Sequence, residues 1–319
     1  MTAHLQAAMG YSPGLRLALL NVTFSLPLLL MKVVVKLCVL LALINIACGK
    51  PNVPDSPFPA YDHIVVVFFE NHEFDSVINC PDAYYFKELI SDPHTALFTH
   101  SYALTHPSQP NYIMFFSGEN QGVTTTDRPP TSFTTPNLAA QLVDSGYTFV
   151  TYSEGLPYPG YDGDTYGRYA RKHNPVANWM GPLKNQVDSA LNQPFTAFPT
   201  NYNELPTISF VVPDLDNDMH DGPISLGDAW LRTNLGAYAE WAKTNNSLLI
   251  VTFDEGNYEP DGNHIVTFFT GDHIVGGSYD EIINHYSVLR TLQDIYNLPH
   301  CGNTKTHYPI QSVFEERER

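Results

Sequence analysis

Acidic and amide side chains follow three apolar runs of the chain that are rich in Val, Ile and Phe. Such runs are typical of buried strands, and the carboxyl ends of parallel strands meet at one edge of a sheet, where ligands bind. Oxygen donors from several strand ends are what a divalent cation needs, whereas a single Asp there is more often a turn residue or a helix cap. Three acidic strand ends together favour a metal site. The residues concerned are Glu70 and Asn71, then Asp214, then Asp254 and Glu255.

Ser108 stands shortly before an apolar stretch that ends at Gly118. Because Pro110 is tolerated in the first turn of a helix, this pattern predicts a helix that begins at or near Ser108. The free N–H groups and the dipole at such an end favour an anion. A serine in this position is most often an N-cap, and the alternative is a nucleophile that attacks phosphorus. As a nucleophile it needs a base or a metal, because a serine hydroxyl reacts poorly at neutral pH.

Two common routes to serine or phosphate chemistry find no support between residues 62 and 314. That segment contains no Gly-x-Ser-x-Gly turn, which speaks against an α/β-hydrolase triad, and no Gly-x-x-x-x-Gly-Lys loop, which excludes a P-loop enzyme. Metal activation is the route that remains. A divalent cation would favour the Ser108 alkoxide and polarise the phosphoryl oxygen under attack. Its ligands would be Glu70, Asn71, Asp254 and Glu255.

Three segments resemble, in the same order, motifs of the phosphoesterase family, which contains secreted acid phosphatases and bacterial phospholipases C. They read Phe-Glu-Asn-His at 69–72, Thr-His-Pro-Ser-Gln-Pro-Asn-Tyr at 105–112 and Thr-Phe-Asp-Glu-Gly at 252–256, within a similarity that covers roughly 62–298. The fold of that family is similar to the alkaline phosphatase superfamily. The resemblance implies that Ser108 is phosphorylated transiently and that the four proposed ligands bind a metal ion.

The resemblance also implies roles for side chains near these motifs. Ser108-x-Pro110-Asn111 looks like the nucleophile turn of nucleotide phosphodiesterases in the same superfamily, where the Asn holds a phosphoryl oxygen. Asn111 is therefore expected to bind substrate. His220 resembles a histidine that lies beside the phosphate in the family, so it is the candidate for donating to an oxygen or protonating the leaving group.

A further histidine and a second metal site are open alternatives. His264, ten residues past Asp254, is a similar candidate for substrate binding. Superfamily members with two metals use an Asp and a His near this point, so Asp214 and His220 could instead form a second site. For each histidine the competing interpretation is a structural imidazole. Surface or packing roles are expected for three other side chains: His106, Lys172 and His173.

Alternating β-rich and amphipathic segments position these side chains, and they predict a mainly parallel sheet covered by helices on both sides. The expected fold class is α/β with three α/β/α layers, and the resemblance implies an alkaline phosphatase-like arrangement. The segment 152–203, rich in Tyr, Gly, Pro and Asn, is expected to pack over the sheet edge. Strands are expected at 63–69, 147–152, 207–212, 248–253 and 265–270. Helices are expected at 136–145 with Thr135 as a cap, 226–243 and 285–296.

Residues 1–50 differ from the rest of the chain. Lys32 and Lys36 precede an apolar run that ends in small residues, which is the pattern of a secretory signal peptide whose natural start would be Met31. The alternative is a membrane anchor. However, the two lysines separate two apolar stretches, and neither reaches the length of roughly 20 residues that a membrane-spanning helix needs. We therefore expect a secreted or extracytoplasmic protein with no stable membrane insertion, a linker at 51–61 and a phosphoesterase domain at 62–314.

An oxidising compartment would allow two modifications. Cys80 and Cys301 remain after removal of the signal, together with Cys48 if cleavage falls before it. The even pair predicts one disulfide that ties the start of the domain to its end. The sequence Asn-Asn-Ser at 245–247 is a glycosylation acceptor if the protein passes through an endoplasmic reticulum.

The chain is acidic, with 33 Asp and Glu against 16 Lys and Arg and a formal net charge of -17 over 319 residues. Nucleic-acid binding needs clustered basic side chains, so this balance argues against it. An acidic surface also repels phosphorylated substrates at long range, and a bound cation would compensate for this locally.

These patterns predict a secreted, metal-dependent acid phosphatase that hydrolyses small phosphate monoesters through a phosphoserine. The alternatives are a phospholipase C-like phosphodiesterase and a non-catalytic secreted binding protein on the same scaffold. Carboxylate and amide ligands suit several divalent ions, so the sequence leaves the identity of the metal open.

Overall fold

The computed structural model describes residues 57–257 and 262–315. These residues belong to one compact unit of the chain, which begins at Asp55. The predicted signal region, with Met31 and Cys48, and the first part of the predicted linker lie outside the described residues.

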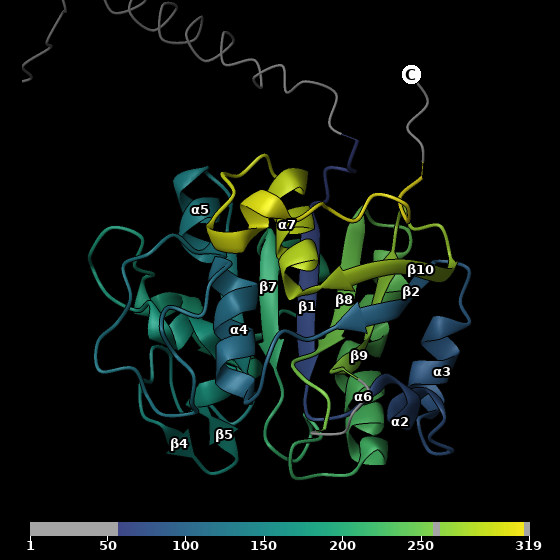
Figure 1. The fold of residues 1–319 in the computed structure, drawn as a ribbon, viewed down its shortest axis with the longest axis horizontal. Coiled ribbons are helices and arrows are strands. Elements are labelled where there is room, and N and C mark those ends of the chain that lie inside the picture. The colour runs from purple at the N-terminus through teal and green to yellow at the C-terminus, as the bar shows by residue number, and fades with distance from the viewer. Residues whose placement is uncertain (1–56, 258–261, 316–319) are drawn as a thin grey trace, which may run out of the picture. The chain divides into compact units, whose positions relative to one another are not determined.

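An eight-stranded sheet forms the centre of the structure, in the order β10-β2-β9-β8-β1-β7-β3-β6 (Figure 1). Strand β9 pairs antiparallel with both of its neighbours, β8 and β2, and the other pairings in this sheet are parallel. The mainly parallel sheet predicted from the sequence is therefore confirmed. The strands are β1 (His63–Phe69), β2 (Thr95–Tyr102), β3 (Phe149–Ser153), β6 (Asn192–Pro194), β7 (Ile208–Val212), β8 (Ser247–Phe253), β9 (His264–Gly271) and β10 (Gly277–Asn284).

Helices cover both faces of the sheet, which gives the three expected layers (Figure 1). Successive residues of β1 alternate between a core shared with α4, α5 and α7 and a core shared with α2, α3 and α6. Burial on both faces is the reason why β1 is apolar throughout. Among the described helices, none is long and apolar enough to cross a membrane. The helices are α2 (Phe74–Ile78), α3 (Tyr84–Ile90), α4 (Ser108–Ser117), α5 (Leu138–Asp144), α6 (Ile224–Ala242) and α7 (His285–Ile295).

The predicted strands and helices are all present, with ends shifted by no more than two residues. Strands β2 and β10 escaped prediction because both carry several polar residues, and β10 lies at the edge of the sheet with much of its length exposed. The cap of α5 is Asn137 rather than Thr135. The Asn137 side chain accepts from the Ala140 N–H (3.0 Å), whereas the Thr135 carbonyl accepts from the Trp179 indole (3.0 Å).

The segment between β3 and β7 is the excursion expected at the edge of the sheet. It contains a two-stranded ribbon, several single 3-10 turns and β6, which pairs with β3 and becomes the edge strand. Figure 1 shows the ribbon to the lower left of the sheet. Its strands are β4 (Thr165–Tyr166) and β5 (Tyr169–Ala170).

The predicted disulfide between Cys80 and Cys301 is wrong, because both thiols are free. Cys301 is buried in the core on the face of the sheet covered by α4, α5 and α7. Cys80 packs against the core on the opposite face. A disulfide spans at most roughly 7 Å between Cα atoms, so it does not reach across the sheet.

Gly118 ends α4 in a left-handed conformation (φ 78°), and a Cβ atom there would lie 2.4 Å from the Cys301 carbonyl oxygen. Gly118→Ala is therefore expected to reduce the free energy of unfolding by about 2–4 kcal/mol, through backbone strain and overpacking together. Urea denaturation measures the loss. Gly122→Ala is the matched control, because Gly122 has a similar φ (80°) and open space around it. Its expected loss is about 1–2 kcal/mol, and equal losses for both variants would contradict the packing argument.

Candidate active site

Three neighbouring strands, β8, β1 and β7, end at the edge of the sheet that carries the predicted ligands. Phe69 and Phe253 are paired across β1 and β8, so the residues that follow them, Glu70 and Asp254, lie side by side. The Asp254 N–H donates to the Phe69 carbonyl (2.9 Å), and the Glu70 N–H donates to the carbonyl of Asp218, which follows β7 (2.8 Å). Strand pairing therefore brings three acidic segments together.

Ser108 is the first residue of α4, and it is buried at this edge. Its Oγ lies 3.0 Å from Glu70 Oε2 and 3.2 Å from Glu255 Oε1. Because the hydroxyl carries one proton, it donates to only one of the two carboxylates at a time. The free backbone N–H groups of the first helical turn also lie at this end of α4. A hydroxyl between carboxylates at a helix N-terminus has the chemical means to act as a nucleophile toward an anion.

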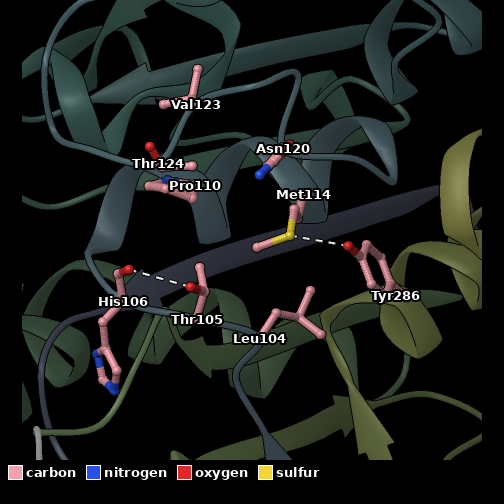
Figure 2. A pocket seen from close by; sticks show the side chains of 9 residues that line it. All are labelled: Leu104, Thr105, His106, Pro110, Met114, Asn120, Val123, Thr124 and Tyr286. Atoms are coloured by element: carbon pink, nitrogen blue, oxygen red, sulfur yellow. Dashed lines mark hydrogen bonds between the residues drawn. The ribbon is translucent and has the colours of Figure 1, made fainter.

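A cavity of about 250 Å³ lies beside the first two turns of α4 (Figure 2). Pro110 and Met114, four residues apart in the helix, line it together with Leu104 and Val123. The Tyr286 hydroxyl donates to the Met114 sulfur (3.0 Å), as the dashed line in Figure 2 shows. Its other lining residues are polar, so the wall mixes apolar and hydrogen-bonding groups: Thr105, His106, Asn120, Thr124 and Tyr286.

Glu70, Asp254 and Glu255 form a buried cluster of carboxyl groups beside Ser108. Burial raises the pKa of Asp254 to about 7 and, together with the charge of Asp254, raises the pKa of Glu255 to about 8. The pKa of Glu70 is raised well above its usual range, first by burial and then by the charges of Asp254 and Asp218. A bound cation would offset both effects, since it attracts the charges that burial and repulsion disfavour.

The donors of this cluster fit a divalent metal ion. Asp254 Oδ2 is buried, and it has no hydrogen-bond partner among the described residues. Asn71 adopts a left-handed conformation (φ 57°), and its N–H donates to Asp254 Oδ1 (3.2 Å). Carboxylate and amide oxygens are the ligands that hard divalent cations prefer. Of the four predicted ligands, the structure places the three carboxyl groups beside one another and the backbone of Asn71 against one of them.

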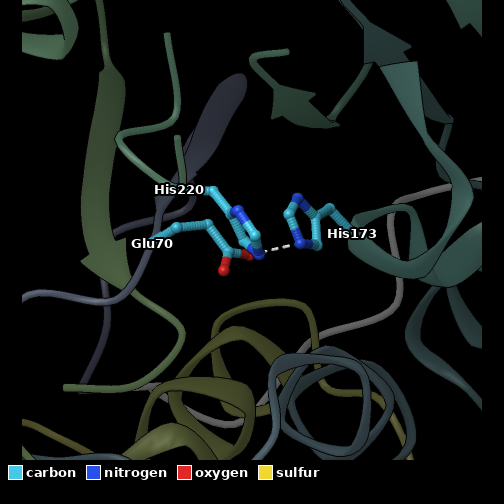
Figure 3. Close-up of side chains that lie close together, drawn as sticks. All are labelled: Glu70, His173 and His220. Carbon is cyan, nitrogen blue, oxygen red and sulfur yellow. Dashed lines mark ion pairs between the residues drawn. The ribbon is translucent and has the colours of Figure 1, made fainter. Parts of the chain in front are cut away.

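Glu70 also belongs to a second group of possible ligands, which it forms with His173 and His220 (Figure 3). One ligand atom from each residue lies within 4.8 Å of the other two. His173 is buried, with Nδ1 2.9 Å from Asp218 Oδ2 and Nε2 3.1 Å from Glu70 Oε1. Burial and then the charge of Lys172 lower the pKa of His173 well below its usual range, so the ring is neutral. With Nδ1–H donated to Asp218, the Nε2 lone pair faces Glu70, and a cation or a proton between them stabilises this arrangement.

His220 contacts a charged group at each ring nitrogen. Lys172 Nζ lies 2.9 Å from Nε2, and Asp221 Oδ1 lies 2.7 Å from Nδ1. Since an ammonium group only donates, Nε2 accepts from Lys172 and Nδ1–H donates to Asp221. The positive charge of Lys172 also partly offsets the effect of burial on the pKa of Glu70 and Glu255. Lys172 is therefore part of the electrostatics of the carboxyl cluster.

Asn111 is fully buried, and its side chain holds the loop before Ser108. Its Oδ1 accepts from the N–H groups of Leu104 (3.1 Å) and Thr105 (3.2 Å). Its Nδ2 donates to the Thr105 carbonyl (2.7 Å) and, at 3.3 Å, to Glu255 Oε2. The structure thus places Asn111 against the carboxyl cluster, with both the oxygen and the nitrogen of its side-chain amide in hydrogen bonds.

His264 and Asp214 contact other groups. His264 Nε2 lies 2.8 Å from the Thr99 carbonyl, and the ring stacks on Phe74 with 4.6 Å between ring centroids. Asp214 Oδ1 accepts from the N–H groups of the turn that follows it, which is the role of a turn residue. His220 is therefore grouped with His173 and Glu70 in the structure.

Sequence reasoning missed several side chains of the site. His106 Nδ1 lies 3.0 Å from Glu255 Oε2, and the Tyr112 hydroxyl donates to Glu70 Oε1 (2.6 Å). Both residues belong to the same eight-residue motif as Ser108, and this position in the motif could have identified them as residues of the site. The excursion between β3 and β7 supplies two more residues, Lys172 and His173. Surface or packing roles were predicted for both, because an irregular segment has no periodic pattern that would indicate a site.

A model described as "Phosphoesterase family" matches residues 80–299. The chain belongs to the Phosphoesterase family. The "Phosphatidylinositol-3-phosphatase" of Mycobacterium tuberculosis is 43% identical to it over 261 residues, which cover 81% of this chain and 85% of the relative. The "Phosphate-repressible acid phosphatase" of Penicillium chrysogenum is 30% identical over 259 residues, which cover 76% of this chain and 61% of the relative. This phosphoesterase is a phosphoric ester hydrolase.

Solved structures share the fold of this phosphoesterase. A protein of the alkaline phosphatase superfamily from Vibrio parahaemolyticus aligns with a TM-score of 0.52 at 14% identity, over 76% of this chain and 68% of that one. The phosphonate monoester hydrolase of Silicibacter pomeroyi aligns with a TM-score of 0.52 at 10% identity, over 81% of this chain and 78% of that one. The predicted α/β fold class with an alkaline phosphatase-like arrangement is confirmed.

Proposed function

We propose that this chain is a metal-dependent phosphatase of the acid-phosphatase type that hydrolyses phosphate monoesters through a phosphoserine at Ser108. The observation that carries the proposal is the buried Ser108 hydroxyl at the start of α4, within 3.2 Å of both Glu70 and Glu255. A buried hydroxyl needs one acceptor, and two buried carboxylates repel each other. Two buried carboxylates beside one hydroxyl therefore reduce the free energy of unfolding, and arrangements of this kind are typical of catalytic sites. Family membership and the names of the relatives support a phosphate ester as the substrate.

The first step transfers the phosphoryl group to Ser108. The Oγ proton moves to a neighbouring carboxylate, and the ionised forms of Glu70 and Glu255, whose oxygens lie 3.0 and 3.2 Å from Oγ, are the acceptors within reach. The bond from Ser108 Oγ to phosphorus forms while the bond from phosphorus to the leaving oxygen breaks. Water then cleaves the phosphoserine to serine and inorganic phosphate.

We assign the metal site to the four predicted ligands. When bound there, a divalent ion supplies positive charge that favours the Ser108 alkoxide and stabilises the charge on the phosphoryl oxygens. The unpartnered Asp254 Oδ2 and the raised pKa values of the three carboxyl groups support this assignment. The ligands are Glu70, Asn71, Asp254 and Glu255.

Donors for the phosphoryl and leaving oxygens are available around Ser108. The free N–H groups at the start of α4 suit an anion. Asn111 is the proposed side-chain donor, because its 3.3 Å bond to Glu255 is weak enough to be exchanged for a phosphoryl oxygen. We assign protonation of the leaving oxygen to His220, with Lys172 at 2.9 Å as the neighbouring proton source.

Export from the cytoplasm stays a prediction that depends on residues 1–50. Glycosylation at Asn245 depends on it in turn, and that residue lies in the turn between α6 and β8. We propose a secreted or extracytoplasmic location on these grounds.

Phosphate release from 4-nitrophenyl phosphate, measured beside hydrolysis of bis(4-nitrophenyl) phosphate, tests the proposed function. The full chain, supplied with a divalent ion, is expected to hydrolyse the monoester in clear preference to the diester. A preference for the diester would support the phospholipase C-like alternative instead. Absence of both activities in folded protein, across acidic and neutral pH and several divalent ions, would overturn the proposal.

His220→Gln is expected to slow hydrolysis of an alkyl phosphate by about 100-fold but that of 4-nitrophenyl phosphate by less than about 10-fold. The reason is that nitrophenolate leaves without a proton, whereas an alkoxide does not. Steady-state kcat values for the two substrates measure the difference. His94→Gln is the control, since His94 is exposed and its ring contacts Asp92, and it is expected to change neither rate. A loss that is equal for both substrates in His220→Gln would rule out a role as general acid.

A further inference from the structure

Lys172 brings a positive charge from the excursion between β3 and β7 to the carboxyl cluster. It lies in a single 3-10 turn, and its Nζ lies 2.9 Å from His220 Nε2. Figure 3 shows the rings of His220 and His173 directed at the Glu70 carboxyl group. The Oε2 atom of that group lies 3.0 Å from Ser108 Oγ. His220 and Glu70 therefore link the ammonium group of Lys172 to the proposed nucleophile.

The ammonium group of Lys172 has more donors than the protein uses. It carries three N–H groups and no acceptor. In the part of the chain that the structure describes, its one hydrogen-bond partner is His220 Nε2, so two donors remain for water or a substrate. Lys172 is half-buried and lines a cavity of about 270 Å³, which is also lined by Gln109, the residue after the proposed nucleophile. The side chain is thus held at His220 and still accessible beside the start of α4.

The charge of Lys172 acts on the acidic side chains around Ser108. Burial raises the pKa of Glu70, Asp218 and Glu255, and in each case the positive charge of the lysine partly offsets this rise. The ammonium group therefore lies within Coulombic range of all three carboxyl groups. A cation in this position also reduces the repulsion between these groups and a phosphate that binds beside them.

Phosphate monoesters and diesters differ in the charge that such a cation meets. The second pKa of a monoester is about 6, so above neutral pH its phosphoryl group carries nearly two negative charges. A diester carries one, because a second carbon group is bonded to one of the oxygens. Coulombic attraction grows with the charge of the anion, so a fixed ammonium group stabilises a bound monoester more than a bound diester.

We infer that Lys172 is a catalytic residue whose ammonium group binds a nonbridging oxygen of the phosphoryl group transferred to Ser108, and that this contact selects dianionic monoesters over monoanionic diesters. The inference rests on the proposed function, because it needs the phosphoryl group to be bound at Ser108. The contact is a charge-assisted hydrogen bond, and no covalent bond to Lys172 forms or breaks. It uses a different N–H from the one donated to His220, which serves the leaving oxygen.

Lys172→Met tests the inference, because it keeps an unbranched side chain and removes the charge. The values of kcat/KM are measured for 4-nitrophenyl phosphate and bis(4-nitrophenyl) phosphate at about pH 7.5, where the monoester is a dianion. Both substrates release nitrophenolate, which leaves without a proton, so the loss of a proton source affects neither. The variant is expected to lower kcat/KM by about 100-fold for the monoester and by less than about fivefold for the diester. The Ki of inorganic phosphate, which needs no diester turnover, is expected to rise by about tenfold or more.

Lys184→Met is the matched control, because Lys184 is an exposed lysine of the same excursion. It removes the same charge from the chain at a position away from the carboxyl cluster. Both kcat/KM values and the Ki of phosphate are expected to stay within about twofold of the wild type. Thermal unfolding shows whether each variant is folded.

Three outcomes would overturn the inference: an equal loss for both substrates in Lys172→Met, an unchanged Ki of phosphate in that variant, or the same change of the substrate ratio in Lys184→Met. Hydrolysis of 4-nitrophenyl phosphate by the wild type separates this failure from that of the proposed function. If that activity is present, exceeds diester hydrolysis and depends on Ser108, the proposed function stands while the inference fails. If the diester is preferred or no phosphate ester is hydrolysed, both fail.

Discussion

Ser108→Ala is expected to lower kcat for 4-nitrophenyl phosphate by about 10⁴-fold or more. The effect is large because Ser108 Oγ is the proposed acceptor of the phosphoryl group, so its removal deletes a chemical step instead of weakening a contact. Phosphate release at saturating substrate and metal measures it. Thermal unfolding of the variant shows whether the fold is intact.

Ser117→Ala is the matched control for this result. Ser117 is the last residue of the same helix and is also buried, and its Oγ lies 2.9 Å from the carbonyl oxygens of both Ile113 and Glu119, to one of which it donates. Its loss is expected to cost some stability and to leave kcat within about twofold. If Ser108→Ala retained activity close to that of Ser117→Ala, Ser108 would not be the nucleophile.

Acid quenching provides a second readout of the same mechanism. Wild-type protein mixed with a phosphate-labelled aryl phosphate and quenched in acid is expected to retain label on the peptide that contains Ser108. The same treatment of Ser108→Ala is expected to leave the protein unlabelled. Label on another residue in the variant would show that this other residue is the nucleophile.

Removal of divalent ions with a chelator is expected to abolish activity and to lower the thermal unfolding temperature. Without a cation, the buried carboxyl groups of Glu70, Asp254 and Glu255 lose the charge that offsets their burial and mutual repulsion. An ion present at 100 times its Kd stabilises the folded state by about 2.7 kcal/mol, which corresponds to a shift of about 5 °C or more in a chain of this size. Thermal unfolding with and without added ions measures the shift independently of catalysis.

Two aspartates that follow strands allow this experiment to be controlled. Asp254→Asn is expected to remove most of the stabilisation by the metal, because it neutralises a buried ligand. Asp214→Asn is expected to keep it, since an amide oxygen can still accept from the turn N–H groups that Asp214 binds. A wild-type response to metal in Asp254→Asn would contradict the assigned ligand set. A lost response in Asp214→Asn would instead support a metal site that includes Asp214.

The strand ends and the helix start on which the site is built follow from local patterns in the sequence. Strands β1 and β8 are apolar throughout because both faces of the sheet are buried, so each is recognisable, and the residue after each is placed at the edge of the sheet. Glu70 and Asp254 therefore become neighbours once the two strands pair in parallel. Ser108 was located in the same way, because Pro110 and Gly118 mark the two ends of a single short helix.

The other side chains that contact these residues are set by the path of the folded chain. Lys172 lies in an irregular segment with no periodicity, and the path of that segment over the sheet edge brings it to His220, 48 residues away. The free thiols of Cys80 and Cys301 follow from the same cause, since the chain path places them on opposite faces of the sheet. Local patterns record whether a residue is buried in a strand or a helix. Contacts between loops depend on how distant segments pack against each other, and this is why the contact of Lys172 with His220 could be found only in the folded chain.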